Sequence, residues 1–164
     1  MSLAPKLLTL VIVQDGSRIL LGKKKRGFGE GYFNGFGGKV EPGEKVSQAA
    51  LRELKEEAGI SAKDLELRGV LTFNFDDKPQ PWEVHVFRVS HWSGQPAESD
   101  EMIPQWFHSS SIPYEQMWAD DPYWYPLFLE GKRFTGTFDF RDTHSLVSHS
   151  LREAGEAELL ARSD

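Results

Sequence analysis

The chain has 164 residues, enough to bury a core in one domain with little room for a second, so a single domain over 1–164 is expected. Its net charge of −6 argues against binding to the backbone of long DNA or RNA, because that affinity depends on clustered Lys and Arg. The absence of cysteine excludes disulfides and thiolate ligands or nucleophiles, and it fits a cytoplasmic protein, with a nuclear or mitochondrial share left open.

The first part of the chain carries two apolar runs typical of paired strands. Residues 7–13 and 17–21 flank an Asp15-Gly16 turn, and the first run is too short to span a bilayer, so no membrane association is expected. A glycine-dense stretch over 23–44 follows, in which the backbone must turn often or approach a ligand closely. Its basic start is a solvated strand end or, at one lysine, a contact to phosphate, with a nuclear import signal as a third alternative.

The clearest helix is predicted over Val46–Ala58, because apolar residues recur there every four positions and Gly59 can end the helix in the left-handed conformation. A second helix is expected within 118–131, with Asp121 as its N-cap and Pro122 as its first residue. Further strands are predicted at 65–75, 82–89, 106–107, 133–140 and 145–151, with a frayed tail from about 153 to 164. Together these elements predict an α/β fold whose mixed sheet is covered on both faces.

Three carboxylates share one face of the first predicted helix. Glu53, Glu56 and Glu57 stand at spacings i, i+3 and i+4, where like charges repel. Carboxylate oxygens are hard ligands suited to Mg²⁺ or Mn²⁺, and Mg²⁺ usually shares its remaining positions with water and substrate phosphates. The row therefore indicates a cation site for a phosphate-bearing ligand. A solvated acidic face, with Arg52 and Lys55 as partners, is the alternative.

The residues around this helix follow a fixed spacing. The pattern runs Gly38, five residues, Glu44, seven residues, Arg52-Glu53-Leu54, one residue, Glu56-Glu57, one residue, Gly59-Ile60. It matches the signature of the Nudix hydrolases without a substitution, so the chain resembles that family at nine fixed positions.

The resemblance implies a Nudix fold, with a mixed sheet sandwiched between two main helices, and an enzyme that hydrolyses the diphosphate link of a nucleotide derivative. Its cofactor would be Mg²⁺, for which Mn²⁺ can substitute. The implied metal ligands are the carbonyl of Gly37 or its neighbour, Glu53, Glu56, Glu57 and Glu101. Arg52 is expected to orient a glutamate through a forked hydrogen bond, and Glu44 to stabilise the loop. For Glu101, a surface role at a strand end is the alternative.

Sequence outside this motif resembles a vertebrate, MutT-like branch of the family that destroys oxidised purine nucleoside triphosphates. The shared runs span almost the whole chain, among them KKRGFG from Lys24, NGFGGKV from Asn34 and ESDEM from Glu98. The base pocket implied by this likeness consists of Thr9, Phe28, Asn34, Phe73, Met102, Trp118, Asp120, Asp121 and Trp124. The other nucleotide contacts implied are Lys24, Phe36, Gly37, Gly38, Lys39 and Trp82.

These assignments have structural alternatives. Any single aromatic side chain could serve core packing, and Asn34 could serve the turn before Gly35. Asp120 and Asp121 are adjacent carboxyls that disfavour double ionisation, so one of them can hold a proton near neutral pH and both donate and accept hydrogen bonds. Helix capping is their alternative role. Trp82 departs from the methionine of the mammalian sequences in this branch, which leaves the ranking of substrates open.

The expected function is nucleotide-pool sanitisation: conversion of 8-oxo-dGTP, 2-hydroxy-dATP or purine nucleotides methylated at O6 or N6 to monophosphates and pyrophosphate. The expected partner is a small nucleotide rather than polymeric nucleic acid, and the expected state is a monomer. One alternative is a Nudix hydrolase of dinucleoside polyphosphates or cap-like substrates, against which the lack of long basic surfaces argues. The other is a non-catalytic nucleotide- or protein-binding domain, against which the complete set of carboxylates argues.

Overall fold

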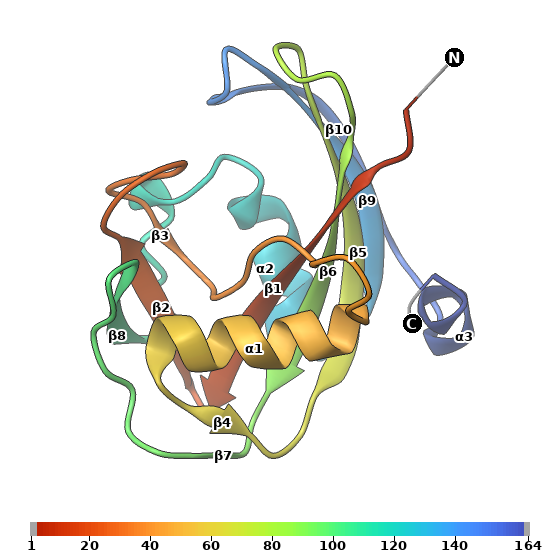
Figure 1. Ribbon diagram of the computed structural model, residues 1–164. Coiled ribbons are helices and arrows are strands. Elements are labelled where there is room, and N and C mark those ends of the chain that lie inside the picture. The colour runs from red at the N-terminus through yellow and green to blue at the C-terminus, as the bar shows by residue number, and fades with distance from the viewer. Residues whose placement is uncertain (1–2, 163–164) are drawn as a thin grey trace.

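The structure, a computed structural model that describes residues 3–162, contains one large mixed sheet with helices on both of its faces (Figure 1). Its strands are β1 Lys6–Asp15, β2 Arg18–Lys24, β3 Phe33–Asn34, β5 Glu66–Phe75, β6 Trp82–Val89, β8 Met102–His108, β9 Phe134–Arg141 and β10 Ser145–Glu153. Their order is β10-β9-β5-β6-β1-β2-β3, and β8 also pairs with β2. The β1–β6 and β5–β9 pairs are parallel and the remaining pairs are antiparallel.

Two main helices sandwich this sheet. α1 (Val46–Ala58) crosses one face and α2 (Asp121–Leu129) lies on the other (Figure 1). Two separate clusters of buried side chains fill the layers on the α1 side and the α2 side. This arrangement confirms the α/β/α Nudix fold expected from the sequence. The smaller elements are β4 (Ser61–Ala62), β7 (Trp92–Ser93), a 3₁₀ turn (Tyr114–Gln116) and α3 (Glu156–Leu160).

α1 has the bounds that its apolar period predicted. Ala50, Leu54 and Ala58 are fully buried in the layer between the helix and the sheet, which holds one face of α1 fixed. The helix ends at Gly59, whose φ of 75° is left-handed and whose N–H donates to the carbonyl of Lys55 at 3.0 Å. Of the acidic residues on α1, Glu56 is turned outward, whereas Glu57 is buried together with the apolar face of the helix.

The start of α2 differs from the prediction by one residue. Asp120, rather than Asp121, holds the N-cap position, and Asp121 is the first helical residue. Neither side chain caps the helix: that of Asp120 accepts a hydrogen bond from Trp124 Nε1 at 2.8 Å. The predicted capping role of Asp121 is therefore wrong, because both carboxyls turn inward and are almost completely buried.

Two further predictions were wrong because they did not take contacts with distant parts of the chain into account. The strand expected at 106–107 extends over Met102–His108, because it pairs along the whole length of β2. The tail expected to fray from about 153 instead forms α3, since Leu159 is buried against the domain and Arg162 donates to Glu83 at 2.7 Å. Its last two residues lie outside the described part of the chain. No helix among residues 3–162 has the length and apolar character needed to cross a membrane.

Candidate active site

Arg52 is the centre of an ion-pair network on the outer face of α1. Its Nε donates to Glu44 at 2.7 Å and its Nη1 donates to Glu53 at 2.8 Å, with Glu56 3.4 Å away. Hydrogen bonds from Arg52 and from the N–H of Glu41 hold the pKa of Glu44 down at about 2. The network fixes Glu44 and Glu53 relative to the helix. Glu56 has the most exposed side chain of the three glutamates predicted as metal ligands on α1.

Glu57 is the buried member of the acidic row. Only 6% of the residue is exposed, and its carboxylate accepts a hydrogen bond from the N–H of Gly37 at 2.9 Å. The pKa of Glu57 is raised to about 7, mainly by burial and also by the charges of Glu53 and Glu101, while the Gly37 hydrogen bond and Lys24 act in the lowering direction. Positive charge placed beside it would restore full ionisation.

The Gly37-Gly38 segment passes between β1 and α1 with no space for side chains. The carbonyl of Gly38 accepts a hydrogen bond from Thr9 N at 2.8 Å. A Cβ on Gly37 would lie 1.9 Å from the carbonyl oxygen of Thr9, and one on Gly38 would lie 2.7 Å from Glu53 Oε1. Glycine is required at Gly37, where a Cβ would collide with the backbone of β1, and a Cβ at Gly38 would displace the carboxylate of Glu53.

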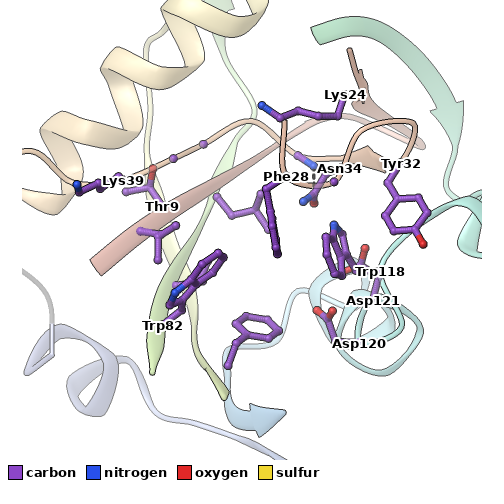
Figure 2. A pocket seen from close by; sticks show the side chains of 18 of the residues that line it. Thr9, Lys24, Phe28, Tyr32, Asn34, Lys39, Trp82, Trp118, Asp120 and Asp121 are labelled. Atoms are coloured by element: carbon purple, nitrogen blue, oxygen red, sulfur yellow. Dashed lines mark hydrogen bonds between the residues drawn. The ribbon is translucent and has the colours of Figure 1, made fainter. Parts of the chain in front are cut away.

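A cavity of about 330 Å³ opens beside this segment, within the usual size range of small-molecule sites. Figure 2 shows Trp82, Phe28 and Trp118 following one another across it, with Lys24 and Lys39 near the helix and Asp120 and Asp121 at the far end. Trp118 stacks between Phe28 and His144, each with its ring centroid 5.0 Å away. Flat apolar walls of this kind suit a flat ring system as ligand.

Asp120 and Asp121 form the polar end of the cavity. Burial and the charge of Asp120 raise the pKa of Asp121 well above its ordinary value, and burial also raises the pKa of Asp120. Asp121 Oδ2 is buried and has no hydrogen-bond partner among the described residues. A proton is therefore retained on this pair, and an unused polar atom is left for a ligand.

Asn34 and Lys24 each have a partner already. Asn34 Oδ1 accepts a hydrogen bond from the N–H of Gly35 at 2.9 Å, which is the turn role considered from the sequence, yet the residue also lines the cavity. Lys24 Nζ donates to Glu101 at 2.8 Å, and Arg26 pairs with the same carboxylate. Glu101 thus holds two basic side chains at the rim. These two hydrogen bonds lower the pKa of Glu101.

Most of the predicted site residues meet around the cavity. Those that line it are Thr9, Lys24, Phe28, Asn34, Gly37, Gly38, Lys39, Glu57, Phe73, Trp82, Met102, Trp118, Asp120 and Asp121. Phe36 does not line it: its ring is fully buried in the layer under α1. Trp124 is also fully buried and meets the cavity only through its hydrogen bond to Asp120. Both predicted substrate contacts are therefore corrected to supporting positions in the core.

Sequence analysis did not assign nine of the residues that line the cavity, nor His144, which packs against the lining residue Trp118. The additional lining residues are Lys6, Leu8, Leu10, Gly29, Tyr32, Gly35, Phe75, Val84 and Phe140. Leu8, Leu10 and Val84 alternate along neighbouring strands, which could have predicted a shared face but not that this face is open. His144 lies in the β9–β10 turn, and nothing in the sequence indicates that it packs on Trp118.

Comparison with known proteins agrees with this geometry. Residues 5–128 match the model of the NUDIX domain, which is well over half of the chain. The chain belongs to the Nudix family.

Its similarity to Nudix relatives covers almost the full length. The chain is 53% identical to the oxidized purine nucleoside triphosphate hydrolase of Danio rerio and 49% identical to that of Mus musculus. Each match covers 90% of this chain and 95% of the relative. The fold is similar to the crystal structure of a MutT protein from Bacillus halodurans, with a TM-score of 0.79 and 28% identity over 89% of this chain and 97% of that one.

Nudix hydrolases generally use divalent metal ions, and the chemistry of the donors here fits such an ion. The acidic row of α1 and the carbonyls of the Gly37-Gly38 segment are hard oxygen ligands, and the partly protonated Glu57 lacks a compensating cation. Across residues 3–162, no three acidic or histidine side chains form a ready-made metal site. The reason is visible in the contacts, because Arg52 holds Glu53 and Glu56 while Gly37 holds Glu57.

The raised pKa of Asp121 predicts how the free protein responds to pH. The folded protein keeps a proton that the unfolded chain releases near pH 4, so the free energy of unfolding should fall as the pH rises from about 4 through the folded-state pKa. The limiting slope is about 1.4 kcal/mol per pH unit. Asp121→Asn has no proton to lose, so its stability relative to the natural chain should increase with pH.

Urea unfolding of both proteins at about pH 4, 6 and 8 measures this difference. Asp15→Asn, at the exposed β1–β2 turn, makes the same chemical change outside the cavity and should leave the pH dependence as it is. Parallel stability curves for the natural chain and Asp121→Asn would show that Asp121 carries no proton in the folded state.

Proposed function

We propose that this Nudix protein hydrolyses oxidised purine nucleoside triphosphates to monophosphates and pyrophosphate. The observation that carries the proposal is the position of the Asp120–Asp121 pair, at the far end from Lys39 and α1 of an aromatic cavity whose lining also includes Glu57 and Gly38. A base held against the aspartates extends its phosphates toward α1. The names of the relatives from Danio rerio and Mus musculus support the same substrate class.

The phosphate end of the proposed site combines acidic and basic groups. Lys39 and Lys24 border the cavity near the acidic row and can contact phosphate oxygens. When bound, Mg²⁺ supplies the charge that neutralises the diphosphate and makes a nearby water more acidic. Glu53, Glu56, Glu57, Glu101 and the carbonyl of Gly37 are the proposed groups that hold it. Arg52 keeps Glu53 in position through its 2.8 Å hydrogen bond.

The base end selects by hydrogen bonding. A protonated carboxyl donates a hydrogen bond while its ionised neighbour accepts one, so Asp120 and Asp121 together can pair with a donor and an acceptor on one base edge. Asn34 offers its amide nitrogen, since its oxygen is used by Gly35. Oxidation of a purine changes which ring positions donate and which accept hydrogen bonds. Asp120, Asp121 and Asn34 can distinguish oxidised from unmodified purines by this difference. Trp118 and Phe28, which stack on each other, provide apolar aromatic surface beside the base.

The rival substrates within the family are dinucleoside polyphosphates and cap-like nucleotides. The cavity of about 330 Å³ suits one nucleobase with its sugar better than two bases. We therefore favour a single free nucleotide as partner. A monomeric state, a cytoplasmic location with a possible nuclear or mitochondrial share, and no binding to membranes or polymeric nucleic acid complete the proposal.

Product identification tests the proposed reaction. Incubation of the protein with 8-oxo-dGTP and Mg²⁺ should give 8-oxo-dGMP and pyrophosphate, separable by ion-exchange chromatography, and chelation of the metal should stop turnover. Unmodified dGTP and a dinucleoside tetraphosphate serve as competing substrates in parallel reactions. Release of inorganic phosphate from 8-oxo-dGTP, or faster cleavage of the dinucleotide, would overturn the assignment.

A further inference from the structure

Lys78 contacts three rings of the cavity wall from the β5–β6 turn. Phe28, Phe75 and Trp82 are in mutual contact, with centroids 4.9 to 6.0 Å apart. The ammonium of Lys78 lies over all three, at 5.2 Å from Phe28, 5.7 Å from Phe75 and 5.6 Å from Trp82. The three rings line the cavity, whereas Lys78 itself does not. The wall is therefore an aromatic cage already occupied by a cation of the protein.

No carboxylate neutralises this cation. Within residues 3–162, Lys78 forms no ion pair, and its backbone N–H is tied to the carbonyl of Phe75 at 3.1 Å, which holds the turn against the rings. Lys6 repeats the arrangement on a smaller scale, since its ammonium lies 4.7 Å from the centre of Trp82 and likewise forms no ion pair in the described chain. Trp82 thus contacts two uncompensated positive charges.

The opposite end of the cavity offers less negative charge than its two carboxyl groups suggest. Asp120 and Asp121 are buried and retain a proton between them, so the pair carries less than its full formal charge. A ligand ring between these two ends lies between a wall that carries two lysine ammonium groups and an acid pair that carries one negative charge instead of two. Aromatic cages without such a lysine bind cationic rings well, because the π face attracts positive charge.

We propose that Lys78, assisted by Lys6, sets the charge selectivity of the base site: the pocket admits neutral purines and rejects purines whose ring carries a positive charge, such as 7-alkylated guanine. The inference rests on the proposed function, because it assumes that the cavity takes the base. Cationic purines are rejected because the ammonium of Lys78 already makes the cation–π contacts with Phe28, Phe75 and Trp82. The same ammonium repels a second cation across a poorly solvated wall.

The test compares 8-oxo-GTP with 7-methyl-GTP, whose base carries a positive charge on its imidazole ring. In Lys78→Met, which keeps the length of the side chain and removes the charge, the ratio of kcat/KM for 7-methyl-GTP to that for 8-oxo-GTP should rise about tenfold. Lys78→Arg should keep the natural ratio, since it restores a cation. Lys63→Met, at an exposed lysine outside the cavity, is the matched control and should also leave the ratio unchanged.

Failure of this inference is separable from failure of the proposed function. Normal hydrolysis of 8-oxo-GTP with an unchanged ratio in Lys78→Met would overturn the role of Lys78 and leave the function intact. No hydrolysis of 8-oxo-GTP by the natural protein would overturn the function. Quenching of tryptophan fluorescence by 7-methyl-GMP and by 8-oxo-GMP would then still decide whether Lys78→Met changes the affinity for the first nucleotide relative to the second. If Lys78→Met unfolds, high salt should weaken the discrimination of the natural protein, and salt-independent discrimination would overturn the inference.

Discussion

Glu57→Gln is expected to lower kcat by about 10²–10⁴-fold, the range typical of losing a group that acts directly in proton transfer or charge stabilisation. The substitution keeps a carbonyl oxygen able to accept the hydrogen bond of Gly37, so the fold around the loop should persist. It removes the negative charge that a divalent cation needs. Steady-state hydrolysis of 8-oxo-dGTP measures kcat, and tryptophan quenching by 8-oxo-dGMP should show that nucleotide binding remains.

The matched control for this substitution is Glu41→Gln, in the exposed part of the loop that precedes α1. It makes the same chemical change without altering a predicted ligand, so its kcat should stay close to that of the natural protein. Near-normal turnover in Glu57→Gln would remove Glu57 from the catalytic groups and move the metal site elsewhere.

Asp120→Asn should reduce the preference for 8-oxo-dGTP over dGTP by about ten- to a hundredfold. The amide still accepts the hydrogen bond of Trp124, so the start of α2 is preserved. It cannot share a proton with Asp121, and its NH₂ presents a donor where the carboxyl can accept. A mispaired buried polar group costs about 1–3 kcal/mol, and each 1.4 kcal/mol is tenfold in relative kcat/KM.

Competition between the two nucleotides in one reaction gives this preference directly. Asp15→Asn, in an exposed turn, should leave it unchanged. If the preference survives in Asp120→Asn while the protein remains folded, Asp120 only supports Trp124 and the base is read by other groups.

The local features of the fold were predictable because they depend on local chemistry. α1 and β6 have the bounds predicted from their apolar periods, and Gly59 ends α1 in the left-handed conformation. Elements that depend on distant partners were not predictable. β8 is extended by its pairing with β2, and α3 forms because the burial of Leu159 stabilises a segment that is polar by composition.

The candidate site was predictable to a similar degree. The spacing of Glu53, Glu56 and Glu57 along one helix is a local property, and the motif around it identified the family. Whether an aromatic side chain faces an open cavity or the core depends on how the layers close, which composition does not reveal. Trp124 was assigned to the base pocket and Phe36 to the other nucleotide contacts for this reason, although both are fully buried.

The contribution of the β5–β6 and β9–β10 turns to the candidate site could not be predicted from the sequence either. Lys78 and His144 are single polar residues in turns, where a solvated role is the usual expectation. Only the paths of the flanking strands bring them onto Phe28 and Trp118, respectively. The aromatic wall of the cavity is therefore assembled from several separate parts of the chain, each of which is uninformative alone.

Crystals grown with Mn²⁺ and 8-oxo-dGMP, measured at the manganese absorption edge, test the central claim most directly. The claim is that the acidic face of α1 exists to hold a divalent cation against the phosphates of a nucleotide whose base lies between Trp118 and the aspartates. We expect an anomalous peak within coordination distance of Glu53, Glu56 or Glu57 and of a phosphate oxygen. Bound nucleotide without such a peak, with the three carboxylates still held by Arg52 and Gly37, would contradict the claim.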